Sequence, residues 1–134
     1  MKVLVDTSVW SLALRRRAPT HPAATELRRL IEAGRAALIG AIRQEVLSGI
    51  SEAPAFERLR DHLGAFPDEP LTAADYETAA GFCNSCRAKG RQGSNTDFLL
   101  CAVSVRHRMP LLTTDGDFSR FATVLPVALH AFGG

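Results

Sequence analysis

Several residue types are scarce in this 134-residue sequence, and each scarcity excludes a class of protein. There are only three cysteines, two of which, Cys83 and Cys86, lie three positions apart. An odd number of closely spaced cysteines does not form the disulfide framework of a small secreted domain. We therefore expect every thiol to be free and the protein to work in a reducing compartment.

Long hydrophobic runs are also missing. The longest apolar stretches cover residues 36–42 and 98–105, well short of the roughly 20 residues that a membrane-spanning helix needs. The apolar residues 3–5 are followed at once by Asp6, so no secretory signal is expected at the N-terminus. A cytoplasmic protein that makes no contact with membranes is expected.

Charge of one sign is not in strong excess, and lysine is nearly absent. The 16 basic and 14 acidic residues leave a formal charge of +2, too small to identify a nucleic-acid-binding protein. Lys2 and Lys89 are the only lysines. The arginine bias suits phosphate recognition, although a G+C-rich genome would produce it as well. With 46% hydrophobic residues, residues 1–134 should form a single domain.

Short apolar runs alternate with segments of helical periodicity. The runs predict strands at residues 2–5, 36–39, 110–113 and 124–128, and Leu71 is a candidate for a further short strand. Helices are expected at 8–15, 22–33, 41–51, 54–66, 73–86, 95–107 and 118–121. Strands that are apolar throughout and alternate with helices indicate an α/β fold, a central parallel sheet covered by helices on both faces.

Two of these strands end in the same way. Asp6 directly follows the first strand, and Asp115 follows the strand at 110–113. Each acid alone would be read as a helix cap. Ligands of open parallel sheets, however, bind at the carboxyl ends of the strands. The pair therefore predicts a site at that edge.

Two further acids border buried helix faces. Asp97 lies in the first turn of its helix, on the same flank as Cys101 and Val105. Glu45 lies at the edge of the apolar stripe that includes Ile42. Carboxylates that converge repel one another unless a cation binds. With no histidine spaced to join them, an all-oxygen set favours Mg²⁺ or Mn²⁺ over Zn²⁺.

Four segments together resemble a known family. They are V-L-V-D-T-S-V-W at 3–10, I-R-Q-E-V-L-S-G at 42–49, N-T-D-F-L-L-C-A at 95–102 and T-T-D-G-D-F at 113–118. In order and spacing they are similar to PIN domains, and more closely to the VapC-type toxins of bacterial toxin-antitoxin pairs. The resemblance spans almost the entire chain and implies a three-layer α/β/α PIN-like fold.

The resemblance also implies an activity. It is that of a metal-dependent endoribonuclease whose metal-bound water attacks a phosphodiester and leaves a 5′-phosphate and a 3′-hydroxyl. Asp6, Glu45, Asp97 and Asp115 would hold one or two Mg²⁺ (or Mn²⁺) ions, and Asp117 matches a further acidic position of the metal site. Hydroxyl groups that orient the ligands would come from Ser8, Thr113 and Thr114. Implied partners are transfer or ribosomal RNA, a cognate antitoxin and a second copy in a homodimer.

Other signals in the sequence have competing interpretations. The C-x-x-C of Cys83 and Cys86 falls late in a helix and lacks the further ligands of a zinc site, so buried core thiols are expected. Basic residues in two stretches are candidate RNA contacts, although a solvated loop is an equal explanation. They are Arg15, Arg16, Arg87, Lys89 and Arg91.

Two alternative functions remain at this stage. A catalytically inert RNA- or protein-binding module on the same fold would be expected to have lost some of the acids, which are all present. A Mg²⁺-dependent phosphotransfer domain also places an aspartate after its first strand. Haloacid-dehalogenase-type enzymes, however, have a second aspartate where this sequence has Ser8. Receiver domains need a lysine at a late strand, whereas Lys89 lies in a loop.

Overall fold

The computed structural model describes residues 1–15, 18 and 20–133, and a parallel sheet lies at its centre. Its strands are β1 (Val3–Val5), β2 (Ala36–Ala37) and β3 (Leu111–Leu112), in the order β2-β1-β3. In register, Leu4 of β1 lies opposite Ala37 on one side and Leu111 on the other. The first strand is thus the central one, and its carboxyl end lies beside that of β3.

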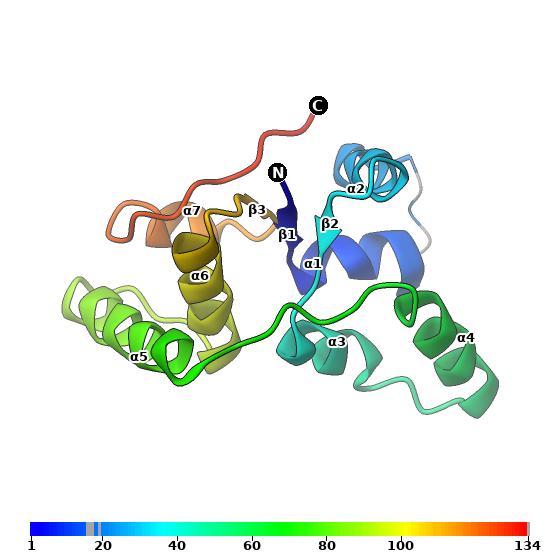
Figure 1. Ribbon diagram of the computed structural model, residues 1–134, viewed down its shortest axis with the longest axis horizontal. Coiled ribbons are helices and arrows are strands. Elements are labelled where there is room, and N and C mark those ends of the chain that lie inside the picture. The colour runs from blue at the N-terminus through cyan, green and yellow to red at the C-terminus, as the bar shows by residue number, and fades with distance from the viewer. Residues whose placement is uncertain (16–17, 19, 134) are drawn as a thin grey trace.

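Helices cover both sides of this sheet, as the three-layer α/β/α prediction requires. They are α1 (Thr7–Trp10), continued by the π-helical η1 (Ser11–Arg15), α2 (Pro22–Glu32), α3 (Gly40–Leu47), α4 (Ala53–Leu63), α5 (Ala73–Ala88), α6 (Asn95–His107) and α7 (Asp117–Phe121). Figure 1 shows α5, α6 and α7 to the left of the strands and α1, α2 and α4 to their right. None of these helices is long and apolar enough to cross a membrane, over the residues that the structure describes.

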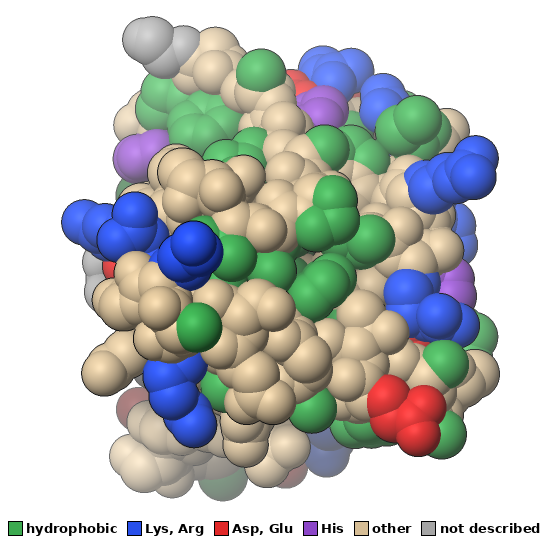
Figure 2. All heavy atoms as spheres, turned by 90° about the vertical axis from the view of Figure 1, so that its left-hand side faces the viewer, with side chains coloured by type: hydrophobic (Ala, Val, Ile, Leu, Met, Phe, Trp, Pro, Cys, Tyr) green, Lys and Arg blue, Asp and Glu red, His purple; other side chains and the backbone are tan. Residues whose placement is uncertain are grey.

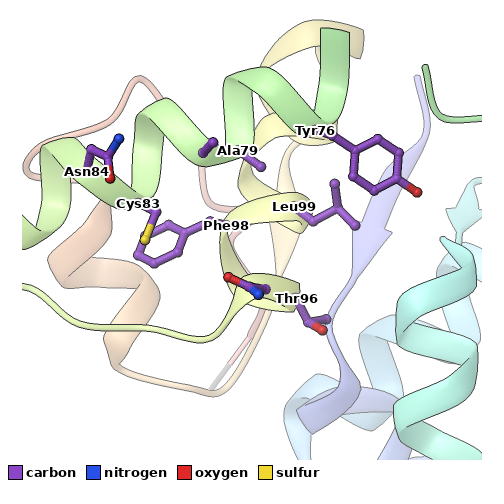
Figure 3. Close-up of a pocket in the computed structure, with 9 residues that line it drawn as sticks. Tyr76, Ala79, Cys83, Asn84, Thr96, Phe98 and Leu99 are labelled. Atoms are coloured by element: carbon purple, nitrogen blue, oxygen red, sulfur yellow. The ribbon is translucent and has the colours of Figure 1, made fainter. Parts of the chain in front are cut away.

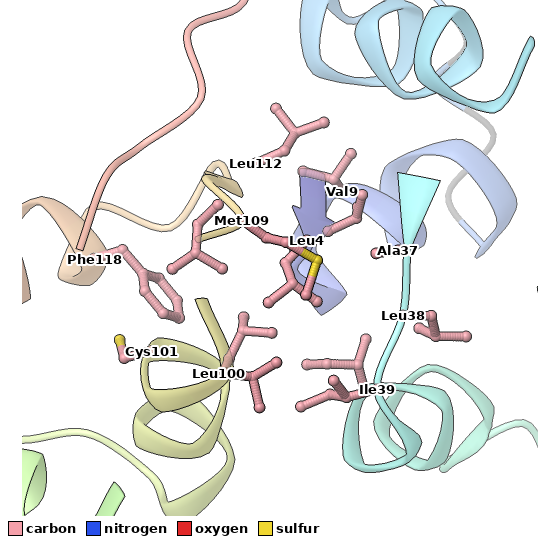
Figure 4. Close-up of a cluster of buried hydrophobic side chains, with 14 of the residues drawn as sticks. Leu4, Val9, Ala37, Leu38, Ile39, Leu100, Cys101, Met109, Leu112 and Phe118 are labelled. Carbon is pink, nitrogen blue, oxygen red and sulfur yellow. The ribbon is translucent and has the colours of Figure 1, made fainter. Parts of the chain in front are cut away.

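The hydrophobic core surrounds β1. All three residues of that strand are completely buried, because a strand with helices on both faces has no side toward water. Figure 4 shows Leu4 clustered with Leu100 of α6 and with Ile39, which follows β2. Burying a side chain of this size contributes roughly 1.5–3 kcal/mol, so the core fixes the position of β1 and of Asp6 after it.

Helix α6 is buried on nearly every side. The sequence predicted an amphipathic helix with one apolar face, but residues Phe98 through Ser104 are all buried. The reason is that α6 lies between the sheet and α5 (Figure 1), and a helix in the middle of a domain has no solvent face. The N-terminus of α6, which carries Asp97, is thereby fixed against the core.

The strands are shorter than the sequence predicted, and two predicted strands do not form. Residues 124–128 are not a strand, and beyond β3 the sheet continues only as an isolated bridge between Leu111 and Leu129. Leu71 also lies outside any strand, and β2 is instead extended by a bridge between Leu38 and Asp68. At both edges the neighbouring chain makes too few ladder bonds to count as a strand. Next to the bridge of Asp68, Pro67 has no N–H to donate.

Candidate active site at the carboxyl edge of the sheet

Asp6 lies in the middle of the predicted site, where β1 ends. It is only 6% exposed, and it occupies the N-cap position of α1 without making a side-chain capping bond. Its Oδ2 instead accepts hydrogen bonds from the hydroxyls of Ser8 (2.8 Å) and Thr113 (2.9 Å). The Asp6 side chain is therefore held by neighbours from two elements rather than used to begin a helix.

Ser8 and Thr113 form a small hydroxyl network with the loop after β3. The Ser8 Oγ accepts from the backbone N–H of Thr114 at 3.1 Å, and the Thr113 Oγ1 accepts from the N–H of Asp115 at 3.0 Å. Each hydroxyl thus accepts from the loop and donates to Asp6. The network fixes the orientation of Asp6 relative to the residues around Asp115, as orienting groups around ligands do.

Asp97 approaches the same place from α6. Its Oδ2 accepts from the N–H of Ser94 (3.0 Å), while its own N–H donates to Ser94 Oγ (3.1 Å), which completes a capping box. Asp97 is therefore a helix-capping residue as well as a candidate ligand. Its half-buried position at the start of a buried helix is the one that the sequence predicted.

The electrostatics show that three carboxylates share this site. Burial raises the pKa of Asp97, and the negative charges of Asp6 and Asp115 raise it further. Burial likewise raises the pKa of Asp6, against the hydrogen bonds of Ser8 and Thr113, which lower it. Like charges that perturb one another in this way are close in space. Asp6, Asp97 and Asp115, which are distant in the sequence, therefore lie near enough for the charges of Asp6 and Asp115 to act on Asp97.

Glu45 joins this group through a residue that the sequence analysis did not single out. Glu45 is exposed on α3, and its Oε1 accepts a 2.7 Å hydrogen bond from the hydroxyl of Thr7. Thr7 directly follows Asp6, and the sequence analysis assigned it no role. Its position next to an acid at the end of a strand was the signal that could have identified it.

Asp115 and Asp117 have different surroundings. Asp115 is exposed, and its Oδ1 accepts from the N–H of Asp117 at 2.9 Å. The carboxylate of Asp117 is paired with Arg120 at 2.7 Å, one helical turn away on α7. Asp117 therefore has a cationic partner in the chain itself, whereas no ion pair of Asp6 or Asp97 is found among the described residues.

The donors around Asp6 fit a hard divalent cation. They are carboxylate and hydroxyl oxygens, which Mg²⁺ and Mn²⁺ prefer. The nearby thiol of Cys101 stays protonated, because burial and the charges of Asp97 and Asp6 raise its pKa. Within the described residues, no three Asp, Glu, His or Cys side chains are close enough together to coordinate one ion. Burial raises the pKa of Asp6, and a bound cation would favour its ionised form.

The predicted RNA-contacting residues fall into two groups. Arg16 lies outside the described residues, as does the side chain of Arg15. Arg87 and Lys89 are exposed at the end of α5, whereas Arg91 is half-buried and its Nε is buried without a hydrogen-bond partner. Arg87 and Arg91 line a hollow of about 260 Å³. The same loop reaches Gly93, whose backbone packs beside Asp97.

The two cysteines of the C-x-x-C pair are not joined by a disulfide. All three cysteines are free. Cys86 and Cys101 are buried as expected, but Cys83 is only half-buried. Figure 3 shows Cys83 in the wall of an open hollow of about 420 Å³ between α5 and α6, where Tyr76, Phe98 and Leu99 also lie. The prediction that both paired thiols belong to the core is therefore wrong for Cys83.

Comparison with known proteins identifies the family. The PIN domain model matches residues 3–124. The chain is 31% identical over 134 residues to VapC ribonuclease Mb1587 of Mycobacterium bovis and to Ribonuclease VapC11 of Mycobacterium tuberculosis, and each match covers 97% of this chain and 98% of the relative.

Solved structures show the same fold. The complex VapBC2 from Rickettsia felis, bound to a DNA fragment from its promoter, matches with a TM-score of 0.78 at 14% identity over 97% of this chain and 98% of the other. FitAcB from Neisseria gonorrhoeae matches with a TM-score of 0.75 at 16% identity over 96% of each chain. From the family model and the 31% identity over nearly the full length, the chain belongs to the PIN-domain family and, within it, to the VapC group.

Proposed function

We propose that this protein is a Mg²⁺- or Mn²⁺-dependent endoribonuclease that acts as the toxin of a type II toxin-antitoxin pair. The proposal is supported by the position of Asp6 and Asp115 after the neighbouring parallel strands β1 and β3, and by the effect of both charges on the pKa of Asp97. The relatives that are 31% identical to this chain are VapC ribonucleases, which supports the choice of RNA as substrate. Retention of all the acids argues against an inert binding module.

The roles of the residues follow from their positions. Asp6, Glu45, Asp97 and Asp115 would hold one or two ions, which when bound neutralise the phosphate and lower the pKa of a water molecule. Ser8 and Thr113 keep Asp6 in one rotamer, and Thr7 holds Glu45 toward the same edge. Thr114 positions Ser8 through its backbone N–H. Asp117, paired with Arg120, would act mainly through the N–H that it donates to Asp115.

The basic loop after α5 would hold the RNA backbone. Figure 2 shows the side of the molecule that carries α5, α6 and α7, where Lys and Arg side chains surround a central hydrophobic area and acidic side chains are few. Arg87 lies in the last turn of α5 and Arg91 in the loop that leads to Asp97, and the buried Arg91 Nε has no hydrogen-bond partner among the described residues. Arg87→Ala with Arg91→Ala should weaken RNA binding and flatten its salt dependence, because phosphate contacts act through counterion release.

The remaining partners are proposed from the same family membership. An antitoxin protein is supported by the fold match to VapBC2 of Rickettsia felis, which was solved bound to a DNA fragment from its promoter. Transfer or ribosomal RNA as the substrate class and a homodimer as the working unit are proposed by resemblance to the VapC group.

The proposal is tested with purified protein and structured RNA. Cleavage should require Mg²⁺ or Mn²⁺ and stop on addition of EDTA, because the carboxylates alone cannot activate a water molecule against a phosphate anion. The end groups of the products should be a 5′-phosphate and a 3′-hydroxyl. Cleavage that continues in EDTA would rule out the metal-dependent mechanism.

A further inference from the structure

A second hollow opens directly beside Asp115 and is separate from the basic loop. It measures about 540 Å³ and shares the loop of residues 113–116 with the carboxylate site. Its other walls come from His21, before α2, and from the C-terminal segment with Leu129, His130 and Phe132. The volume falls within the roughly 300–1,000 Å³ of small-ligand pockets.

We propose that this hollow binds one nucleobase of the RNA strand, next to the phosphate that lies at the carboxylates. The inference rests on the proposed function. Residues 113–116 line both the hollow and the carboxylate site. An RNA chain with one phosphate at Asp115 would therefore have a neighbouring nucleotide at the hollow. The hollow would then select which base flanks the cleaved bond.

The apolar walls suit a flat aromatic ring. Leu129 is 40% exposed, an unusual position for a large hydrophobic side chain, and Phe132 is half-buried. Leu111 of β3 forms a buried apolar surface behind them. Proteins bind single-stranded RNA by stacking unpaired bases on aromatic and apolar side chains in this way.

His21 supplies a polar group for the edge of the base. Its Nδ1 accepts a hydrogen bond from the N–H of Ala23 at 3.1 Å, so the proton of the neutral ring is on Nε2. Among the described residues, no partner is found for that Nε2–H. A pocket that is mostly apolar, with a few oriented polar groups, is typical of specific small-ligand recognition.

The charge behind the hollow is compensated, which allows a polyanion to approach. His130 Nε2 lies 2.6 Å from Glu26 Oε2, and Arg29 holds the same carboxylate with two hydrogen bonds of 2.8 and 2.6 Å. Glu26 is therefore neutralised by two partners. These contacts also fix the imidazole of His130 and the chain on either side of it, so that the pocket wall is held in place.

The test measures binding of nucleosides by NMR with metal-free protein, so that it depends on neither the ion nor cleavage. Adenosine, cytidine, uridine and, as a probe without a base, ribose are titrated into ¹⁵N-labelled full-length protein. We expect at least one nucleoside to shift the amide signals of Thr114, Gly116, Leu129 and Phe132, and ribose to leave them unchanged. Shifts confined to other parts of the molecule, or equal shifts with ribose, would overturn the proposal.

Substitutions locate the effect. Phe132→Ala should weaken nucleoside binding roughly fivefold or more, as expected from the loss of one stacking partner, and Phe132→Leu should weaken it less. Tyr76→Ala removes an exposed aromatic ring elsewhere on the surface and should change nothing. Unshifted signals outside the hollow show that each variant is folded. Equal affinity of Phe132→Ala and the parent would contradict the proposal.

The two proposals fail in different ways. Nucleoside binding at the hollow together with no metal-dependent RNA cleavage would refute the nuclease assignment. Metal-dependent cleavage by a protein whose hollow binds no nucleoside would refute the base-binding site alone.

Discussion

Gly93 is a residue whose importance comes from the absence of a side chain. A Cβ atom at this position would lie 2.6 Å from Phe121 Cζ and 3.2 Å from both Phe98 Cε2 and Asp97 Oδ2. The first distance is far below van der Waals contact, and Phe121 is almost completely buried. The loop between α5 and α6 therefore packs tightly against the candidate ligand Asp97.

Gly93→Ala should therefore destabilise the protein and reduce RNA cleavage together. The added methyl group overpacks a tight contact, a change that typically costs about 1–3 kcal/mol. It would also displace the side chain of Asp97, which is one of its neighbours. The measurement is thermal unfolding combined with an RNA cleavage assay.

Gly81→Ala is the matched control. Gly81 lies in α5 with no atom within 4 Å of the new methyl group, so alanine should leave cleavage unchanged and stabilise the helix by up to about 1 kcal/mol. If Gly93→Ala behaved like this control, the account of Gly93 would be wrong.

At the residue scale, the sequence predicted the acids better than their surroundings. Asp6 and Asp115 could be located because each follows a strand of a parallel sheet, and Asp97 because it precedes a buried helix face. Gly93 could not be identified, since a glycine in a basic loop is usually only a turn. Its role depends on Phe121, which packs against it from a distant part of the chain.

At the scale of elements, α5 and α6 are joined by a partly buried ion pair. Asp75, in the first turn of α5, is completely buried, and its Oδ1 accepts a 2.8 Å hydrogen bond from Arg106 Nε near the end of α6. Its Oδ2 accepts from the N–H of Thr72. Burial acts to raise the pKa of Asp75, but the bonds from Thr72 and Arg106 and the charge of His107 outweigh it, and the pKa is lowered.

Arg106→Ala should destabilise the protein by about 2–3 kcal/mol. Removing one partner of a fully buried pair typically costs roughly 3–5 kcal/mol, and Arg106 is 40% exposed, so that water replaces part of the lost interaction. Denaturant unfolding measures the change.

The neighbouring Arg108→Ala provides the control, because Arg108 is exposed after the end of α6. The double variant Arg106→Ala with Asp75→Asn should regain part of the stability, since no buried charge remains. A loss of less than about 0.5 kcal/mol in Arg106→Ala would contradict a structural role for the pair.

The sequence predicted the helices well and the sheet edges poorly. Helical periodicity and caps such as Thr72 and Ser94 are local signals, so α5 and α6 were placed to within about two residues. Edge pairing depends on which distant segment comes to lie beside a strand. The bridges of Leu38 with Asp68 and of Leu111 with Leu129 illustrate this. The ion pair of Asp75 and Arg106 is non-local for the same reason.

At the scale of the whole molecule, Glu26 and His130 connect α2 to the C-terminal segment. Their side chains meet at 2.6 Å across 104 positions of sequence. The hydrogen bonds of Arg29 and then of His130 lower the pKa of Glu26 from 4.5 to about 2. A lowered carboxyl pKa stabilises the folded state above the unfolded pKa of 4.5, and the stability is lost as pH falls toward about 2.

Glu26→Gln should therefore have a lower Tm than the parent at pH 6, and the difference should shrink between pH 4.5 and pH 2.5. Thermal unfolding at a series of pH values measures this Tm difference. The effects of acids that both proteins contain cancel when the two Tm values are subtracted. Exposed Glu32, at the end of the same helix, is the control: Glu32→Gln should show little difference at any pH. A Tm difference between Glu26→Gln and the parent that stays constant down to pH 2.5 would contradict the stabilising role of the ionised Glu26 carboxylate.

The central claim is that a divalent cation binds to carboxylates that repel one another without it. Asp6→Asn tests this claim most sharply, because both hydroxyls of Ser8 and Thr113 donate to the same atom, Oδ2. An asparagine whose carbonyl oxygen takes that place keeps both of these bonds and removes the negative charge. Asp61→Asn, an exposed acid on α4, is the control for a change of charge elsewhere.

The deciding measurement is the Tm of the parent and Asp6→Asn with EDTA and with Mg²⁺. In EDTA the variant should be as stable as the parent or more stable, because one of three neighbouring charges is gone. Mg²⁺ at about ten times its Kd should raise the Tm of the parent by roughly 5 °C. It should raise that of Asp61→Asn equally and that of Asp6→Asn by much less. An equal Mg²⁺-induced shift in the parent and Asp6→Asn would contradict the assignment of Asp6 to a metal site.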